Sequence, residues 1–439
     1  MRCSLTLALL GLVWVGGGGR LQAAEGAVDL LREIAAIEPD LHALYRQLHQ
    51  HPELSLHEQE TAARLAARLR ALGIEVTVGV GGHGIVGVVR NGEGPVLMLR
   101  TDLDGLPVRE ETGLPYASRV VVRNEQGQEV PVMHACGHDL HMASWIGAAT
   151  VLLKLRERWR GTLLLVGQPA EEQGDGAKRM IEAGLLRRFP RPSYALAIHD
   201  SADLPAGQVG YTAGFALANV DSVDITVFGK GGHGAYPHTT VDPVVLAARI
   251  VLALQTLVSR EKDPLEPAVV TVGSIHGGTR HNIIPDEVSL QLTVRSYSQT
   301  VRQQLLDGIR RIVEAEAQGA GAPRRPRIVV SAGTPATYND PQLVERVAAA
   351  LVRALGADRV IKMPPVMGGE DFSEYGRAGV PSFLYWIGAV RPDQFAAARR
   401  NGTPLPSLHS SRFAPAYEPA LRTAVHSLVV ASLELLGRP

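Results

Sequence analysis

Six side chains of metal-binding type, spread from position 136 to position 409, constrain the fold of this chain more than any other feature. They are Cys136, His138, Glu171, Glu172, His199 and His409. Each follows an apolar, strand-like run or opens a predicted helix. In an open α/β sheet, such residues converge beyond the carboxyl ends of the strands. The chain is therefore expected to bring them together at one edge of a largely buried sheet.

The residue types in this set indicate a metal site. Thiolate, imidazole and carboxylate are ligands of a borderline-soft divalent metal ion. Glu171 and Glu172 follow directly on the apolar run 163–167. In the loop after a strand both carboxylates can turn into one site, where one binds metal and the other stays free as a base. Because metal-assisted hydrolysis needs that division, the residues predict a metal-dependent hydrolase.

Two further segments carry candidate site residues. Asp102 and Asp104 share one face of a predicted strand by its period of two. Either could ligate a metal or hold a ligating histidine by its second nitrogen, and we favour the second for Asp104. The glycine-rich segment 229–238 lacks the order G-x-x-x-x-G-K-[ST], which excludes a phosphate loop. Its histidines, His233 and His238, could each donate to an oxyanion.

The predicted elements divide the chain. Strands alternate with helices before about 215 and after 335, which is typical of α/β layering. The order between them is β-α-β-β-α-β, a split βαβ unit. Because His409 lies in the last part, the outer parts are expected to form one domain. We predict a signal peptide over 1–24, a catalytic domain over 25–214 and 336–439, and an inserted domain over 215–335.

The first two dozen residues predict export. Arg2 gives a positive start, 5–15 is an apolar run of eleven residues, and 21–24 offer small residues for cleavage. The run is too short to span a bilayer, which needs about 20 residues, and no later segment is expected to be apolar enough to span one. Export to the periplasm or medium removes Cys3 with the signal. Cys136 is then a lone thiol, which metal ligation explains well.

Two smaller expectations follow from composition and local sequence. With 44 Lys and Arg against 44 Asp and Glu, the formal net charge is zero, and no basic stripe predicts nucleic-acid binding. The expected partner is a small-molecule substrate. The helix predicted over 27–48 contains Pro39, which is expected to kink or split it.

Taken in order, the motifs resemble those of the M20 metallopeptidase family. The similarity is greatest to its amidohydrolase branch, which includes hippurate hydrolases, N-acyl-amino-acid aminoacylases and plant auxin-conjugate hydrolases. It covers nearly the whole mature chain and passes through segments 48–55, 100–107, 134–139, 168–172, 229–238, 277–287 and 368–373, up to His409. Asp200 stands where the family commonly has an apolar residue, and Gly105 takes a usual alanine position. Both departures leave the substrate preference open.

The resemblance implies a detailed site. Cys136, His138, Glu172, His199 and His409 would bind two divalent metal ions, with Cys136 bridging, and zinc, manganese, cobalt and nickel all suit such ligands. Glu171 would be the general base, and Asp104 would support the site. His233, with Asn282, would reach across a homodimer and stabilise the oxyanion in the partner's site. The implied fold is a catalytic α/β/α domain with a mixed sheet and an inserted βαββαβ, ferredoxin-like dimerisation or lid domain.

The expected reaction is hydrolysis of the amide bond of N-acyl amino acids, such as hippurate, by a metal-activated water with Glu171 as base. A dipeptidase or carboxypeptidase of the same family is the alternative. A cysteine amidase with Cys136 as nucleophile would leave Glu172, His199 and His409 without a function. An exported binding protein would not need Glu171 beside a full ligand set.

Overall fold

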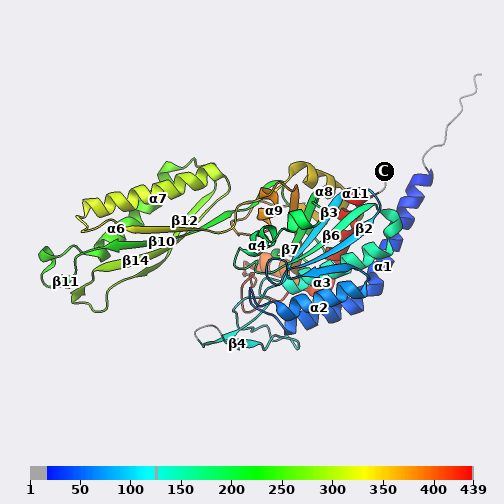
Figure 1. Ribbon diagram of the computed structural model, residues 1–439, viewed down its shortest axis with the longest axis horizontal. Coiled ribbons are helices and arrows are strands. Elements are labelled where there is room, and N and C mark those ends of the chain that lie inside the picture. Colours follow the sequence, from blue (N-terminus) through cyan, green and yellow to red (C-terminus); the bar gives the residue numbers. More distant parts are fainter. Residues whose placement is uncertain (1–16, 124–126, 438–439) are drawn as a thin grey trace, which may run out of the picture.

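The computed structural model of the chain describes residues 17–123 and 127–437. The first 16 residues of the predicted signal peptide lie outside this part, and 17–24 belong to a helix. Two lobes lie side by side along the long axis (Figure 1). The inserted lobe comprises residues 219–332, inside the predicted interval 215–335, and the main lobe comprises the other described residues.

An eight-stranded mixed sheet forms the centre of the main lobe. Its order is β1-β2-β6-β3-β7-β18-β8-β17. The strands are β1 (Glu75–Val78), β2 (Ile85–Asn91), β3 (Val96–Asp102), β6 (Gly161–Gln168), β7 (Tyr194–Pro205), β8 (Val209–Tyr211), β17 (Val360–Lys362) and β18 (Ser382–Val390). The central strands β6, β3, β7 and β18 run parallel to one another, so their carboxyl ends meet at one edge.

Helices cover both faces of this sheet, which gives the predicted α/β/α layering. One face packs against α1 (Gly17–Gln50), α2 (Gln59–Ala71), α3 (His138–Lys154), α8 (Pro341–Leu355) and α11 (Tyr417–Leu436). The other packs against α4 (Gly176–Glu182), α5 (Leu185–Arg188) and α9 (Ser373–Arg377). Neighbouring residues of β3 enter opposite cores, Leu97 and Leu99 the first and Met98 the second, because strand side chains alternate between faces.

The inserted lobe has the predicted βαββαβ order. Its antiparallel sheet runs β12-β14-β10-β15. The elements are β10 (Asn219–Phe228), α6 (Pro243–Thr256), η3 (Leu257–Glu261), β12 (Ala268–His276), β14 (Glu287–Ser296), α7 (Gln299–Gly319) and β15 (Arg327–Ala332). Both helices pack on one face of the sheet through residues such as Ile250, Leu290 and Ile309. This apolar core is separate from the two cores of the main lobe.

Short elements complete the two lobes. In the main lobe they are β4 (Val121–Arg123), β5 (Glu129–Pro131), η1 (Arg156–Arg158), β9 (Gly214–Leu217), β16 (Thr337–Asn339) and α10 (Pro392–Asn401). In the inserted lobe they are β11 (Gly232–His233), η2 (Pro237–Thr239) and β13 (Ile283–Ile284). The chain passes between the lobes twice, into β10 and out of β15, and these antiparallel neighbours form the connection.

The structure corrects three sequence expectations. Pro39 lies inside α1 and does not divide it, since Ile34 and Leu41 on either side of it pack into the same core. The apolar run 195–198 predicts a strand that ends at His199, whereas β7 continues alongside β18 to Pro205. Two helical segments, Pro243–Glu261 and Tyr417–Leu436, are long and apolar enough to cross a membrane, contrary to expectation. The second is 72% buried within the structure, as a core helix is.

Candidate metal centre

The predicted ligands meet at the carboxyl edge of the main sheet. His138 opens α3, and Cys136 lies two residues before it in a loop that Gly137 turns with a φ of 73°. Glu171 and Glu172 follow β6, and His199 projects from β7. His409 lies in the loop before α11, where its backbone N–H donates to the carbonyl of Ala135 at 2.8 Å. Topology alone therefore joins residues that the sequence separates widely.

Two overlapping triads of potential ligand atoms form within this cluster. In each triad all atoms lie within 4.8 Å of one another. One triad is Cys136, His138 and His199, and the other is Cys136, Glu172 and His409. The Cys136 sulfur lies 3.5 Å from Nε2 of His199 and 3.2 Å from Nε2 of His409. Since Cys136 belongs to both triads, the arrangement fits two cations that share a thiolate.

Hydrogen bonds orient the histidines for metal binding. Nδ1 of His138 donates to the backbone carbonyl of Asp104, and Nδ1 of His199 to that of Asp200, each at 2.8 Å. This leaves each Nε2 lone pair facing the cluster, as in metal sites whose ligands are fixed from behind. Nε2 of His138 and Oε1 of Glu172 are buried and have no hydrogen-bond partner. Because unpaired buried polar atoms are costly, this donor set fits a cation.

Asp104 lies beside the cluster and contacts the segments that carry two of the candidate ligands. Its carboxylate accepts hydrogen bonds from the Ser55 hydroxyl at 2.6 Å and from the backbone N–H of Glu172 at 3.0 Å. It also lies 3.3 Å from Nδ1 of His138. The side chain is buried and touches the residues that hold two candidate ligands, so its contacts are those of a positioning residue. It is absent from both triads.

Glu171 differs from Glu172 in its surroundings. It is not in the two triads above, but it forms a further group of potential ligand atoms with His138 and Glu172, and its Oε2 lies 3.9 Å from Nε2 of His138. Burial, together with the charges of Glu370 and Glu172, raises the pKa of Glu171 well above its usual range. A carboxylate of raised pKa next to the ligands, but outside these two triads, suits proton transfer.

The backbone is strained at two points of the site. Ala170, just before Glu171, has a φ of 53°, and His409 has a φ of 65°. Non-glycine residues rarely adopt this left-handed region, which costs about 1–3 kcal/mol each and is concentrated at functional sites. Burial also raises the pKa of the Cys136 thiol, and the charge of Glu172 adds to this. Ligation through sulfur would therefore release a proton.

A buried ionic cluster, which the sequence did not predict, lies beneath the site. The Arg100 guanidinium donates to Asp102 at 2.7 Å, Glu370 at 2.9 Å and Asp371 at 3.0 Å, and also to Gln168. Burial raises the pKa of Asp371 to about 8 even though Arg100 opposes this. Segments 100–107 and 368–373 both carry the family resemblance. The sequence therefore pointed to these residues, but not to the contact between them.

Two more charged pairs lie behind the ligand-bearing segment. His49 contacts Asp139 at 2.6 Å and Glu110 at 3.1 Å; despite burial, these contacts raise its pKa to about 10. The Asp200 carboxylate lies 3.3 Å from Nδ1 of His199 and from Nε2 of His141. It also fills the space where a side chain at Gly137 would project, since a Cβ there would come within 2.2 Å. Asp200 thus requires glycine at position 137.

The ligand cluster opens into a cavity between the lobes. The cavity measures about 580 Å³, and Cys136, Glu171, His199, His409 and Arg295 are among its lining residues. Arg295 comes from β14 of the inserted lobe and donates to the Met367 carbonyl at 3.0 Å. Within the described residues it has no ion-pair partner, and burial lowers its pKa. The sequence interpretation missed this cation because a strand arginine has no distinctive local pattern.

His233 and Asn282 do not join the cluster of their own chain. They lie on β11 and just before β13, where the N–H of Gly234 donates to the Asn282 carbonyl at 2.9 Å. Figure 1 places β11 at the end of the inserted lobe farthest from the main lobe. His233 is exposed, as is His238 nearby. Any action of His233 at a metal centre therefore needs a second chain.

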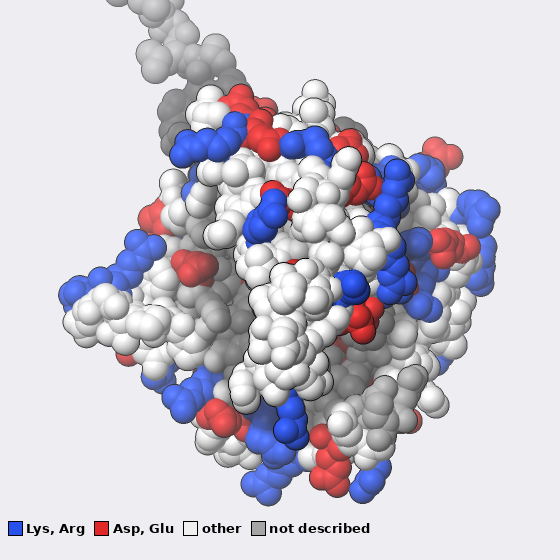
Figure 2. Space-filling view, turned by 90° about the vertical axis from the view of Figure 1, so that its left-hand side faces the viewer, with Lys and Arg blue, Asp and Glu red and all other residues white. Residues whose placement is uncertain are grey.

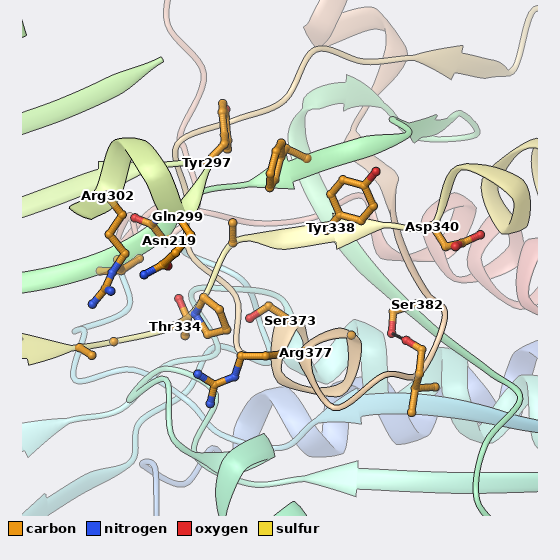
Figure 3. Close-up of a pocket in the computed structure, with 18 of the residues that line it drawn as sticks. Asn219, Tyr297, Gln299, Arg302, Thr334, Tyr338, Asp340, Ser373, Arg377 and Ser382 are labelled. Atoms are coloured by element: carbon orange, nitrogen blue, oxygen red, sulfur yellow. Dashed lines mark hydrogen bonds between the residues drawn. The ribbon is translucent and has the colours of Figure 1, made fainter. Parts of the chain in front are cut away.

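A larger cavity, of about 910 Å³, lies at the connection between the lobes (Figure 3). Tyr297 and Arg302 line it from the inserted lobe, and Tyr338 and Arg377 from the main lobe. It contains none of the predicted ligands. The charge of Arg302 is committed to Asp221, which it contacts at 2.6 Å. The metal-ligand chemistry therefore lies in the smaller cavity.

Comparisons with known proteins agree with this geometry. Residues 98–402 match the sequence profile of peptidase family M20/M25/M40. Thermostable carboxypeptidase 1 of Saccharolobus solfataricus is 36% identical over 88% of this chain and 92% of its own. N-acetylcysteine deacetylase of Bacillus subtilis is 37% identical over 78% and 86%. A crystal structure of the Bacillus subtilis YXEP protein, described as a dinuclear metal-binding peptidase, has a TM-score of 0.74 at 31% identity and covers 92% of this chain and all of that one.

Proposed function

The chain belongs to peptidase family M20/M25/M40, and we propose from this that it is a dinuclear metal-dependent amidohydrolase that cleaves N-acyl amino acids, hippurate-like compounds among them. Cys136, His138 and His199 would hold one metal ion. Cys136, Glu172 and His409 would hold the other. Zinc, manganese, cobalt and nickel all suit these ligands. When bound, the ions would polarise the scissile carbonyl and lower the pKa of a water molecule.

The protein groups have separate tasks in this proposal. Glu171 would accept the proton of the attacking water and deliver it to the leaving amine, and its raised pKa supports that assignment. Asp104 would hold His138 and the backbone of Glu172 in position through the contacts described above. Protein dipoles and charges fixed before the reaction would then act without further rearrangement.

The observation that carries the choice of substrate is the guanidinium of Arg295, which has no carboxylate partner among the described residues and lies in the same cavity as Glu171. A half-buried cation without a carboxylate partner invites an anionic ligand, and Arg binds carboxylates through charge-assisted hydrogen bonds. An N-acyl amino acid has a carboxylate one carbon away from its amide nitrogen. Arg295 would therefore orient the amino-acid part of the substrate while the amide meets the metal ligands.

A carboxypeptidase is the second candidate, since a relative 36% identical to this chain has that name. A peptide with a free C-terminus presents the same carboxylate to Arg295. The test is release of free amino acid from hippurate, N-acetyl amino acids and dipeptides, with chelator and with each metal restored. Metal-dependent cleavage of the acylated substrates supports the amidohydrolase, cleavage of the peptides alone supports the alternative, and no release under any condition excludes both.

We also propose that the active form is a homodimer in which His233 and Asn282 complete the partner's site. Their distance from their own cluster in Figure 1 supports this. On α6, Val245 is 57% and Leu252 73% exposed, and β12 is an edge strand of its sheet. Figure 2 looks onto this end of the molecule, where uncharged surface predominates at the centre. A second copy would cover these apolar side chains.

Mixing two inactive variants tests the dimer. Glu171→Gln would lack the base, and His233→Ala would lack the group given to the partner. In a mixed dimer one site keeps both residues, so random exchange should restore about one quarter of wild-type activity. Each variant refolded alone is the control. Activity of His233→Ala alone at the wild-type level would contradict the assignment.

Export stays a proposal as well. Residues 1–24 have the positive, apolar and small-residue regions of a secretory signal, and we expect a periplasmic or secreted mature protein. Sequencing the N-terminus of protein recovered from periplasm or medium tests this. A chain that stays in the cell with Met1 retained would exclude it.

A further inference from the structure

We propose that an apolar cleft beside the metal centre binds the acyl group of the substrate, so that the enzyme prefers N-acyl amino acids with a large apolar acyl group over N-acetyl amino acids. The inference rests on the proposed amidohydrolase function and adds the class of acyl group to it. The cleft lies wholly within the main lobe and adjoins the segments that carry His199 and His409.

The cleft has the size and lining of a ligand pocket. It measures about 630 Å³, and most of its lining is apolar, including Met363, Phe395 and Leu405. Ligand pockets are commonly 300–1,000 Å³ and predominantly hydrophobic. The charged residues Asp200, Asp203 and Arg399 also line it. Asp203 and Arg399 are exposed, whereas Asp200 is buried beside His199. Because most of the wall is apolar, an apolar group is favoured in the part of the cleft away from Asp200.

The cleft is continuous with the cavity of the metal centre. Val366, Trp386 and Leu408 line both spaces. Trp386 pairs with His199 across the parallel strands β18 and β7, so the two side chains project from the same face of the sheet. Leu408 directly precedes His409. Two of the shared residues are thus immediate neighbours of proposed ligands.

Trp386 also offers a hydrogen-bond donor at this boundary. Its side chain is 7% exposed, and its indole nitrogen is not among the buried polar atoms without a partner. The N–H is therefore accessible to solvent and can donate to water or to a polar atom of a bound substrate.

The arrangement gives the substrate a direction. Arg295 approaches the metal ligands from the inserted lobe. The cleft extends away from these ligands on another side, between β18, α10 and the loop before His409. A carboxylate on Arg295 and an amide at the metal ligands would direct the acyl chain into the cleft. Each methylene that becomes buried there should raise kcat/KM roughly fourfold.

The experiment measures kcat/KM of the metal-loaded enzyme for acetyl, hexanoyl and benzoyl derivatives of one amino acid. We expect hexanoyl to exceed acetyl on the order of two-hundredfold if all four additional methylenes leave water. Ala398→Phe narrows the cleft, and Ala397→Phe is the matched control. Both residues lie on α10 and line a neighbouring cavity, but only Ala398 also lines the cleft. Thermal melting shows whether Ala398→Phe folds. If it does not, Phe395→Ala, which widens the cleft, is the second test variant.

The proposal predicts that Ala398→Phe lowers the hexanoyl-to-acetyl ratio to below about fivefold, whereas Ala397→Phe keeps the wild-type ratio. Phe395→Ala should lower the benzoyl-to-acetyl ratio. An unchanged ratio in both cleft variants, or a wild-type enzyme that favours acetyl, overturns the acyl cleft while metal-dependent cleavage still supports the amidohydrolase. Absence of cleavage of every acylated substrate overturns the proposed function and the cleft with it.

Discussion

The two lobes use the same kinds of elements but differ in what they bury. In the main lobe, Arg100 lies beneath the sheet edge with Asp102, Glu370 and Asp371, all shielded from solvent. In the described part of the inserted lobe, Asp221 is the one charged residue classed as buried, and it lies beside the connection to the main lobe. The core of the inserted lobe is otherwise apolar.

This difference indicates that buried residues have a different role in each lobe. Burying charge is costly and stabilises a fold weakly, so a concentration of buried charge marks the place where chemistry is organised. Apolar packing stabilises the inserted lobe. In the proposed dimer, this lobe would present Arg295 to the site of its own chain and His233 to the site of the partner. The main lobe would supply the reaction and the inserted lobe the recognition.

The largest effects are expected from one core substitution in each lobe, and the two can be compared. Arg100→Met leaves three buried carboxyls without their cation and should cost about 3–5 kcal/mol of unfolding free energy at pH 7. The loss should shrink as pH falls, because protonated carboxyls no longer need the guanidinium. Leu290→Ala should cost about 2–5 kcal/mol at every pH. Urea unfolding at pH 7 and pH 5 measures both, and an equal pH dependence would remove the contrast.

Glu171→Gln tests whether the chemistry belongs to the main lobe. The amide keeps the shape but accepts no proton, so kcat should fall on the order of a hundredfold or more. Metal content should stay at the wild-type level, because Glu171 is not one of the five proposed metal ligands. Glu172→Gln is the matched control and should lose metal. Normal turnover by Glu171→Gln would show that another group is the base.

Arg295→Gln tests recognition by the inserted lobe. Loss of a charge-assisted hydrogen bond of about 1.5–3 kcal/mol should raise KM roughly ten- to a hundredfold and leave kcat less affected. A substrate whose carboxylate is replaced by a carboxamide should not distinguish the variant from the wild type. Loss of kcat with unchanged KM would place Arg295 in the chemical step instead.

The smallest effect concerns His426 on α11 of the main lobe. Burial, together with Arg359, lowers the pKa of His426 to about 4. Because the unfolded histidine titrates near 6.5, its contribution to stability is present above that pH and is lost as pH falls toward 4. At pH 5 the loss should be about 2 kcal/mol or less. The melting temperature of the wild type should fall more steeply between pH 7 and pH 5 than that of His426→Leu. Parallel plots of melting temperature against pH would contradict this.

Much of the fold was predictable because its signals are local. The βαββαβ order of the inserted lobe, the α/β layering and the strand before Glu171 all follow from hydrophobic periodicity. The candidate ligands were predictable from residue type and motif order, and the structure brings all six together. The undivided helix around Pro39 was not predictable, because contacts with a core distant in sequence stabilise it.

The sequence by itself determined which residues can do chemistry: a thiol, three imidazoles and two adjacent carboxylates of suitable type, each near the end or middle of a predictable element. Only the tertiary structure decided how they share space. Arg100 contacts Glu370 across 270 positions, Arg295 enters the site from another lobe, and Trp386 lies between cavity and cleft. Periodicity reports whether a residue is buried, whereas its partners depend on how the sheets and helices pack.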